Sequence, residues 1–309
     1  MRLFFCFLFF AAWNLSAQDY TVGSIQIEGN EVTKDEIVFR EIPLRQGQII
    51  SKDSLSLMVE QISRNLLNTS LFNYVTIDTL VHNGLIYFTI LLEERWYLWP
   101  YPIFEQADRN LSAYFNNKEW DRINYGFYIV RYNFRGRKEI VKAKIRLGYK
   151  EQYALYYEKP YLNKSKTFGL IADFSWFQQK EILYMVNKNK PLYMEGENYL
   201  RKEIRVLTSL VYRPALYQRI KLTFGYNLLQ VSDTVLSLNQ RYLLGKSPDV
   251  QYFLNLEGTH DKRDSWVYPL HGYFLQAGIS AITNLEGNRY GYFNRSEERR
   301  VGKECRSRW

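Results

Sequence analysis

Strict alternation of apolar and polar residues dominates the chain between residues 96 and 294. In residues 141–149 every second residue is apolar, and the intervening positions include Lys142, Lys144 and Arg146. A period of two predicts β-strands with one apolar and one polar face. We expect nine such strands, at residues 97–107, 122–134, 139–150, 152–160, 167–186, 198–213, 218–231, 250–260 and 271–283.

The region between residues 20 and 95 shows a different succession of patterns. An alternating segment comes first, then two stretches with helical spacing, then two further alternating segments joined by Asn83-Gly84, a hairpin signal. Thr33 and Glu36 have the spacing of a capping box at the first helix, and Ser51 would cap the second. The order predicts a small α+β domain (βααββ), with two helices covering one face of a three-stranded sheet.

Both ends of the chain depart from these patterns. Residues 1–17 combine Arg2, an apolar run and small residues at the end, which predicts a secretory signal peptide. Residues 295–309 (RSEERRVGKECRSRW) resemble the translation of a sequencing-library adapter, so we expect them to be an artefact; a natural basic tail is the alternative. Cys6 and Cys305 lie in these two ends, so the region between them offers no disulfide or thiolate metal site.

Composition indicates which kind of β-structure to expect. A mean hydropathy of −0.36 argues against several membrane-spanning helices, and 17% aromatic residues suit a β-protein with interfacial aromatic belts. The polar strand faces carry Lys and Arg, which suit a water-filled lumen better than a dry core. We therefore expect residues 96–294 to form an antiparallel transmembrane β-barrel, although a soluble sandwich would show the same alternation. Because bacterial single-chain barrels have an even strand count, nine strands predict an incomplete barrel.

Short motifs connect both regions with known families. The segments IEGNEVTKDEI and LFNYVTID, with the element order of residues 18–95, resemble a POTRA domain, a periplasmic module that holds unfolded client strands. In the barrel region the turns resemble those of the BamA/TamA family of outer-membrane assembly factors. The matching residues are Asn133, Phe134, Gly136, Arg137, Pro160, Arg213, Pro214, Asp261, Arg263, Asp264, Pro269 and Gly272.

Each of these turn residues also has a purely structural interpretation. The glycines permit tight backbone paths, and the prolines end strand pairing at strand boundaries. Asp261, Arg263 and Asp264 can hold a turn together by charge-assisted hydrogen bonds. We prefer this structural role for them to a chemical one.

Two further sets of residues are candidates for function. The resemblance implies a lateral seam where the last strand of the barrel meets the first, so the first strand is the candidate for one side of a lateral gate. Pro100 and Pro102 would interrupt its ladder, since proline cannot donate, which is compatible with a seam that opens; the prolines would otherwise simply join the two domains. Its gate residues would be Tyr97, Trp99, Tyr101 and Ile103. The residues expected to face the lumen are Lys142, Lys144, Arg146, Arg219 and Lys221.

The resemblance implies a protein of the bacterial outer membrane, with its first domain in the periplasm, that inserts other barrel proteins. Its partners would be unfolded outer-membrane proteins, outer-membrane lipids and accessory periplasmic lipoproteins. A secretion pore that exports a dedicated substrate is the alternative. An enzyme is a third class, resting on His82, His260 and His271 with Asp261 and Asp264, but no nucleophile motif or metal-ligand spacing accompanies them. We expect no catalytic residue, cofactor, metal or nucleic-acid partner.

Overall fold

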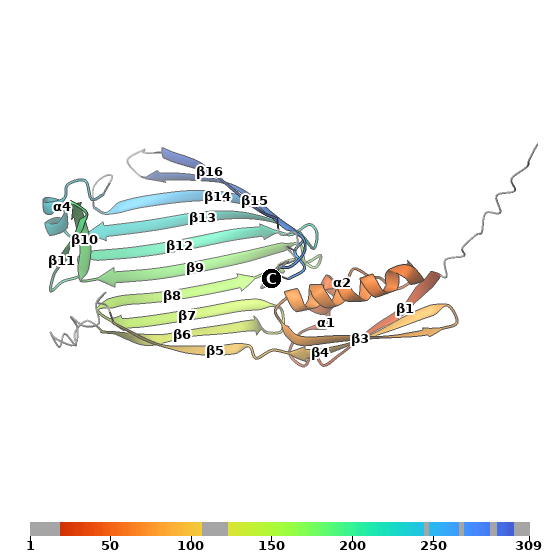
Figure 1. Cartoon of the computed structure of the whole chain (residues 1–309). Coiled ribbons are helices and arrows are strands. Elements are labelled where there is room, and N and C mark those ends of the chain that lie inside the picture. The colour runs from red at the N-terminus through yellow and green to blue at the C-terminus, as the bar shows by residue number, and fades with distance from the viewer. Residues whose placement is uncertain (1–18, 107–122, 244–246, 266–268, 285–288, 300–309) are drawn as a thin grey trace, which may run out of the picture.

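The computed structural model describes residues 19–106, 123–243, 247–265, 269–284 and 289–299, the last of these by their backbone alone. It consists of a small α+β domain and a ten-stranded antiparallel sheet, which lie end to end (Figure 1). The predicted signal peptide lies outside the described residues. So do residues 300–309 of the predicted artefact.

The first domain follows the predicted order, with one short strand added. Its sheet has the order β2-β1-β4-β3, in which β1 and β4 run parallel. The helices cover one face, where Ile62 and Leu66 of α2 share a core with Ile86, Phe88 and Ile90 of β4. The elements are β1 (Asp19–Glu28), α1 (Asp35–Glu41), β2 (Ile49–Ser51), the 3-10 turn η1 (Lys52–Ser54), α2 (Leu55–Asn68), β3 (Phe72–His82) and β4 (Leu85–Glu94).

The two predicted helix caps are wrong. Lys34 is the N-cap of α1 and Ser54 that of α2, and neither side chain accepts a capping hydrogen bond. Thr33 instead donates its backbone N–H and its hydroxyl to the carboxylate of Glu94 on β4. The hydroxyl is therefore committed to a tertiary contact, and the side chain of Ser54 donates to the carbonyl of Ser51.

The second part is a single sheet in which neighbours in sequence are neighbours in space. Its strands are β5 (Leu98–Gln106), β6 (Ile123–Phe134), β7 (Glu139–Gly148), β8 (Lys150–Lys159), β9 (Phe168–Gln179), β12 (Arg201–Tyr212), β13 (Gln218–Val231), β14 (Asp249–Asp261), β15 (Tyr273–Asn284) and β16 (Arg289–Arg299). The mainly β, antiparallel, barrel-like fold is confirmed. The sheet has ten strands, because β16 pairs with β15 as far as Arg299, beyond the predicted end of the pattern at residue 294. The artefactual origin of residues 295–309 stays a prediction.

One predicted strand divides in two. The segment 167–186 forms β9, which stays in the sheet, and β10 (Glu181–Asn187), which leaves it and pairs with β11 (Lys190–Glu195) as a separate hairpin. This hairpin and α4 (Asp233–Leu238) lie at the end of the sheet far from the first domain (Figure 1). A small core that includes Ile182, Val231 and Val235 holds them together.

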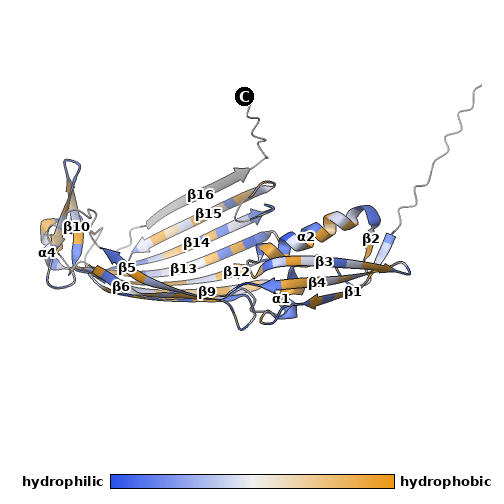
Figure 2. Ribbon diagram, turned by 60° about the horizontal axis from the view of Figure 1, so that its bottom comes forward, coloured by the Kyte–Doolittle hydropathy of each residue, from blue (hydrophilic) through white to orange (hydrophobic). Residues whose placement is uncertain are grey.

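Hydrophilic and hydrophobic residues alternate along many strands of the ten-stranded sheet (Figure 2). Because successive side chains of a strand point to opposite faces, the two faces of the sheet differ in polarity. Side chains such as Phe224, Leu254 and Ile279 form an exposed apolar face. Two hollows lie on the opposite, polar face, which we call the inner face. Among the described residues, none of the helices is both long and apolar enough to cross a bilayer.

Candidate functional site

The first domain rests on four turns at one end of the ten-stranded sheet, and we call this contact the junction. The turns connect β6 to β7, β8 to β9, β12 to β13 and β14 to β15, and they share one end because neighbouring strands run antiparallel. The first domain donates one hydrogen bond to each: Lys34 N to Gly136 O (3.0 Å), Arg40 Nε to Lys166 O (3.5 Å), Gln61 Nε2 to Tyr217 OH (3.0 Å) and Asn68 Nδ2 to Asp264 O (3.1 Å). All four turns therefore take part in holding the domain.

A buried polar cluster fixes the loop before α1 to the first of these turns. Asn133, which is 1% exposed, donates from Nδ2 to the hydroxyl of Thr33 over 2.7 Å and accepts from Lys138 N over 2.9 Å. The hydroxyl of Tyr97 lies 3.2 Å from that of Thr33 and donates to Leu71 O over 2.9 Å. Burial raises the pKa of the Tyr97 phenol, so it stays a neutral donor.

Gly136 lets the two backbones approach each other at this turn. Its φ is +69°, and a Cβ at this position would lie 2.0 Å from the carbonyl oxygen of Val32. Any side chain would therefore push the first domain away and break the bond from Lys34 N to the Gly136 carbonyl. The glycine serves the junction as well as its own turn.

A buried carboxylate forms the electrostatic centre of the junction. Glu41, at the end of α1, is 3% exposed and accepts two hydrogen bonds from the guanidinium of Arg213, at 2.9 and 3.1 Å. The hydroxyl of Tyr161 donates to the same carboxylate over 3.2 Å, and Lys138 Nζ lies 4.0 Å away. One domain thus supplies the anion, and three different turns of the sheet supply its partners.

Burial and nearby charges shift the pKa values of Glu41 and Lys138 in opposite directions. Burial alone would raise the pKa of Glu41, but the positive charges of Lys138 and Arg213 outweigh it, so the pKa lies below its ordinary value. Burial lowers the pKa of Lys138, and Glu41 offsets only part of that effect. Because Glu41 stays ionised near neutral pH, its bidentate ion pair with Arg213 persists there.

A cavity of about 630 Å³ opens beside this cluster. Its walls include Asn65 and Thr69 from the first domain, and Arg219, Glu257 and Gln276 from the inner face of the sheet. The cavity therefore connects the first domain with the inner face.

The most specific motif in the sequence holds its own turn together, as its structural interpretation predicts. Asp261 accepts hydrogen bonds from Nε and Nη2 of Arg263, at 2.8 and 2.7 Å, and the guanidinium stacks over Phe274. Asp264 accepts from the backbone N–H of Ser265 and Leu270. Gly272 has φ +101°, and a Cβ there would lie 2.2 Å from Lys262 O.

The other candidate residues are spread over the structure. Phe134, Arg137, Pro160, Pro214 and Pro269 lie in or beside the same turns. His260 stacks on Tyr273. No group of three or more His, Cys, Asp or Glu side chains within the described ranges is placed to hold a metal ion.

The gate candidate β5 is the last strand at one end of the sheet, and its ladder with β6 is continuous from Leu98 to Gln106. Tyr132 N bonds to Tyr97 O in that register, and hydrogen-bonded pairs alternate along an antiparallel ladder. The backbone groups of Pro100 and Pro102 therefore point away from β6, towards the free edge. The prolines do not interrupt the existing ladder; they remove two donors from the edge where another strand would pair.

Tyr97 departs from the gate interpretation. It precedes β5, is 5% exposed and belongs to the core of the first domain. Trp99, Tyr101 and Ile103 do lie on β5, opposite Val130, Tyr128 and Gly126 of β6. These partners in turn face Lys142, Lys144 and Arg146 of β7, so the aromatic and basic residues share one face.

The five residues expected in the lumen all belong to the inner face. Arg146 lines one of its hollows and Lys221 another, while Arg219 lines the junction cavity. Lys142 and Lys144 alternate with Arg146 along β7, and Lys142 Nζ lies 4.6 Å from the ring centre of Tyr156.

Comparisons with known proteins agree with this arrangement. A POTRA family model, described as a surface antigen variable number repeat, matches residues 20–95. The solved structure of CdiB from Acinetobacter baumannii is 11% identical with a TM-score of 0.51, and the match covers 91% of this chain and 48% of that one. Residues 20–95 thus match a POTRA domain, and the fold of the chain, a POTRA domain followed by a barrel-like antiparallel sheet, resembles that of CdiB.

Other solved structures resemble the chain less closely by TM-score. BamA from Haemophilus ducreyi lacking POTRA domains 1–3 is 14% identical with a TM-score of 0.46, over 85% of this chain and 48% of that one. CdiB from Escherichia coli is 8% identical with a TM-score of 0.30, over 92% and 55%. The chain thus spans about half the length of these proteins. No curated protein matches its sequence.

The residues that couple the POTRA domain to the barrel sheet were only partly found in the sequence. Asn133, Gly136 and Arg213 were singled out, but their partners Thr33 and Glu41 were not assigned to a contact. Glu41 carried one usable signal, since a carboxylate at the C-terminal end of a helix opposes the helix dipole and suggests an external cation. Nothing local marked Tyr161, because its role depends on which turns lie together.

Proposed function

We propose that the protein is an assembly factor of the bacterial outer membrane that receives unfolded barrel proteins and aids their insertion. The edge of β5 opposite β6, which has no partner strand among the described residues, is the observation that carries this proposal. A strand edge with unpaired backbone groups is a template for an incoming strand, and the POTRA domain lies directly before this edge in the chain. The chemistry would be non-covalent pairing of backbone N–H and C=O groups.

The proposed location follows from polarity. An apolar face as exposed as that of the barrel sheet needs lipid around it, and outer-membrane lipids are therefore proposed partners. The POTRA domain would lie in the periplasm with the four junction turns. Accessory periplasmic lipoproteins are proposed to bind the POTRA surface that the junction leaves free.

The prolines of β5 suit an edge that must release what it binds. With no donor at Pro100 or Pro102, a client strand paired there would lack two ladder hydrogen bonds. Each missing bond weakens the pairing by about 1 kcal/mol. The edge would hold a client strand long enough to nucleate its sheet without closing permanently.

Depletion of the full-length protein in its own cells tests the proposal directly. We expect the levels of other outer-membrane barrels to fall, while periplasmic proteins are unaffected. Unchanged barrel levels would contradict an assembly role.

Site-specific photo-crosslinking locates the contact. A photoreactive residue in place of Phe104 on β5 should capture nascent barrel strands, because this side chain is 79% exposed beside the free edge. The matched control is Phe127, which is 63% exposed on the neighbouring strand β6. Equal capture at both positions would mean that the edge has no special role.

A secretion pore that exports a dedicated substrate is the second candidate. The inner face favours it, because Lys142, Lys144 and Arg219 would line a water-filled route with positive charge. If this candidate is right, depletion should abolish export of one protein and leave the other barrels at normal levels.

A further inference from the structure

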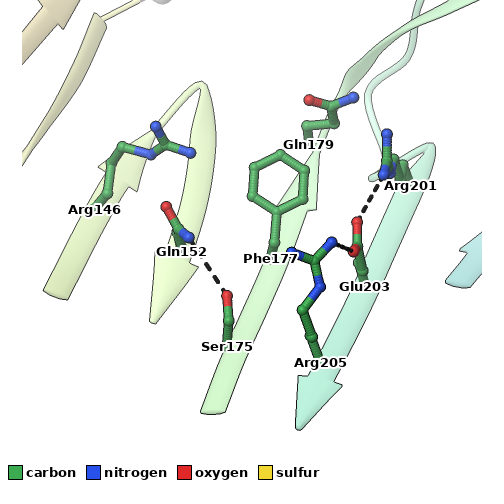
Figure 3. Close-up of a pocket in the computed structure, with 8 residues that line it drawn as sticks. All are labelled: Arg146, Gln152, Ser175, Phe177, Gln179, Arg201, Glu203 and Arg205. Atoms are coloured by element: carbon green, nitrogen blue, oxygen red, sulfur yellow. Dashed lines mark hydrogen bonds and ion pairs between the residues drawn. The ribbon is translucent and has the colours of Figure 1, made fainter. Parts of the chain in front are cut away.

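We propose that the inner face of the barrel sheet carries a binding site for a compact oxyanion, either phosphate or a carboxylate. The site is a pocket of about 290 Å³ towards the end of the sheet that is far from the POTRA domain (Figure 3). We call it the arginine pocket and define it by Arg146, Gln152, Phe177, Arg201, Glu203 and Arg205.

Strand register brings these residues together. Arg146 of β7 lies opposite Gln152 of β8, Gln152 opposite Phe177 of β9, and Phe177 opposite Glu203 of β12. Arg201 and Arg205 are two positions before and after Glu203, so their side chains leave the same face. In Figure 3, Phe177 stands between Arg146 on one side and Arg201 and Arg205 on the other.

The pocket contains more positive than negative charge. Glu203 uses one carboxylate oxygen for Arg201, at 2.7 Å, and the other for Arg205, at 2.6 Å. Within the part of the chain that the structure describes, Arg146 pairs with the carboxylate of Glu105, 3.4 Å away, whose side chain is 50% exposed. Three guanidinium groups therefore share one buried carboxylate and one solvated one.

Two arginine donors are also buried without an acceptor among the described residues. These are the Nε–H groups of Arg146 and Arg201. A buried donor that loses its partner costs about 1–3 kcal/mol, and an incompletely paired buried charge costs more. An oxyanion in the pocket would supply both the missing charge and the missing acceptors.

The available groups match an oxyanion better than other ligands. A guanidinium presents its N–H groups in a planar fork that fits two oxygens of a carboxylate or phosphate. Gln152 Nε2 and Ser175 Oγ are 3.4 Å apart, a long hydrogen bond that leaves both free to turn towards a ligand. The ligand could be a free phosphate or an Asp or Glu side chain of a chain segment inside the barrel.

Titration of the full chain in zwitterionic detergent, in chloride buffer, tests the proposal by calorimetry. One arm uses inorganic phosphate and the other a short glutamate peptide. We expect saturable binding in at least one arm, and the stronger arm identifies the source of the oxyanion. R205Q should weaken binding about tenfold, the value of one charge-assisted hydrogen bond. K221Q, which makes the same charge change elsewhere on the inner face, should change it less than about threefold.

A second variant separates loss of the site from loss of folding. E203Q removes the competing carboxylate and frees Arg201 and Arg205, so it should tighten oxyanion binding, whereas a misfolded chain would only lose it. Absence of saturable binding in both arms, or equal weakening by R205Q and K221Q, would overturn the proposal. So would an E203Q variant that folds and binds more weakly.

Discussion

The same alternation of apolar and polar residues gives a buried apolar face in one sheet of this protein and an exposed apolar face in the other. In β4 of the POTRA domain, the apolar residues Ile86, Phe88 and Ile90 are at most 1% exposed, because α1 and α2 cover that face. In the barrel sheet, Leu254 and Ile279 occupy equivalent alternate positions and are 49% and 61% exposed. A period of two therefore defines which face is apolar, and the environment decides what covers it.

The connections between strands account for this difference. In the POTRA domain the parallel pair β1 and β4 needs a crossover, and the helices in that crossover supply the cover. In the barrel sheet every neighbouring pair is antiparallel, so turns and loops suffice. The barrel sheet thus leaves its apolar face to lipid under the proposed location.

The largest expected effect comes from opening the covered core. Phe88→Ala should lower the free energy of unfolding of the POTRA domain by about 3–5 kcal/mol, because the ring is 1% exposed and its loss leaves a cavity. Urea unfolding of the full chain in detergent, followed by circular dichroism, measures it. Leu254→Ala on the exposed face is the control and should cost far less. Similar losses would mean that the outer face is also packed.

The second-largest expected effect comes from removing the buried carboxylate at the junction. Glu41→Gln leaves Arg213 and Lys138 buried without their anion, which should destabilise docking by about 3 kcal/mol and speed hydrogen exchange at residues 30–36 about a hundredfold. Glu60→Gln, which breaks the exposed pair with Arg64, is the control and should change little. No difference between the two variants would remove Glu41 from the junction.

The same cluster predicts a pH dependence with a definite sign. The pKa of Glu41 in the folded state lies below its ordinary value of 4.5, so its contribution is complete above that pH. As the pH falls from there through the lower, folded-state pKa, the contribution is lost and the junction should open. Exchange at residues 30–36 should respond to acid in the wild type and lose that response in Glu41→Gln.

How much of this was predictable depends on the range of the interaction. The strands, the faces of Lys142 and Arg219, and the placement of four turns at one end follow from local alternation and chain connectivity. The departure of β10 from the sheet does not, because the apolar run within Glu181–Asn187 is compatible with a strand of either sheet, and the core that Ile182 shares with Val235 of α4 forms only through tertiary packing. Thr33 was misread because capping and tertiary hydrogen bonding require the same side chain.

An intermediate effect should arise where the barrel sheet would meet lipid. Leu254→Arg on the outer face should destabilise the barrel sheet in vesicles by about 2–3 kcal/mol, while Asn255→Arg on the inner face should cost less than about 1 kcal/mol. The two residues are neighbours on β14, and Asn255 lines a hollow. Urea unfolding monitored by tryptophan fluorescence compares them. Equal costs would argue for water on both faces.

The smallest effect separates backbone strain from hydrogen bonding at the junction. Asn133 has φ +48°, which glycine adopts freely and alanine adopts at a cost of about 1 kcal/mol. Asn133→Gly should therefore lose the bond to Thr33, which crosses the junction and contributes about 1 kcal/mol to docking, and the bond from Lys138 N, which lies within the turn itself. Asn133→Ala should lose about 1 kcal/mol more through strain in the turn. Asn83 has nearly the same φ, +49°, in a hairpin away from the junction, so Asn83→Ala should show the strain without any change in exchange at residues 30–36. If Asn133→Gly docks as tightly as the wild type, the contact depends on the Gly136 backbone rather than on the buried amide.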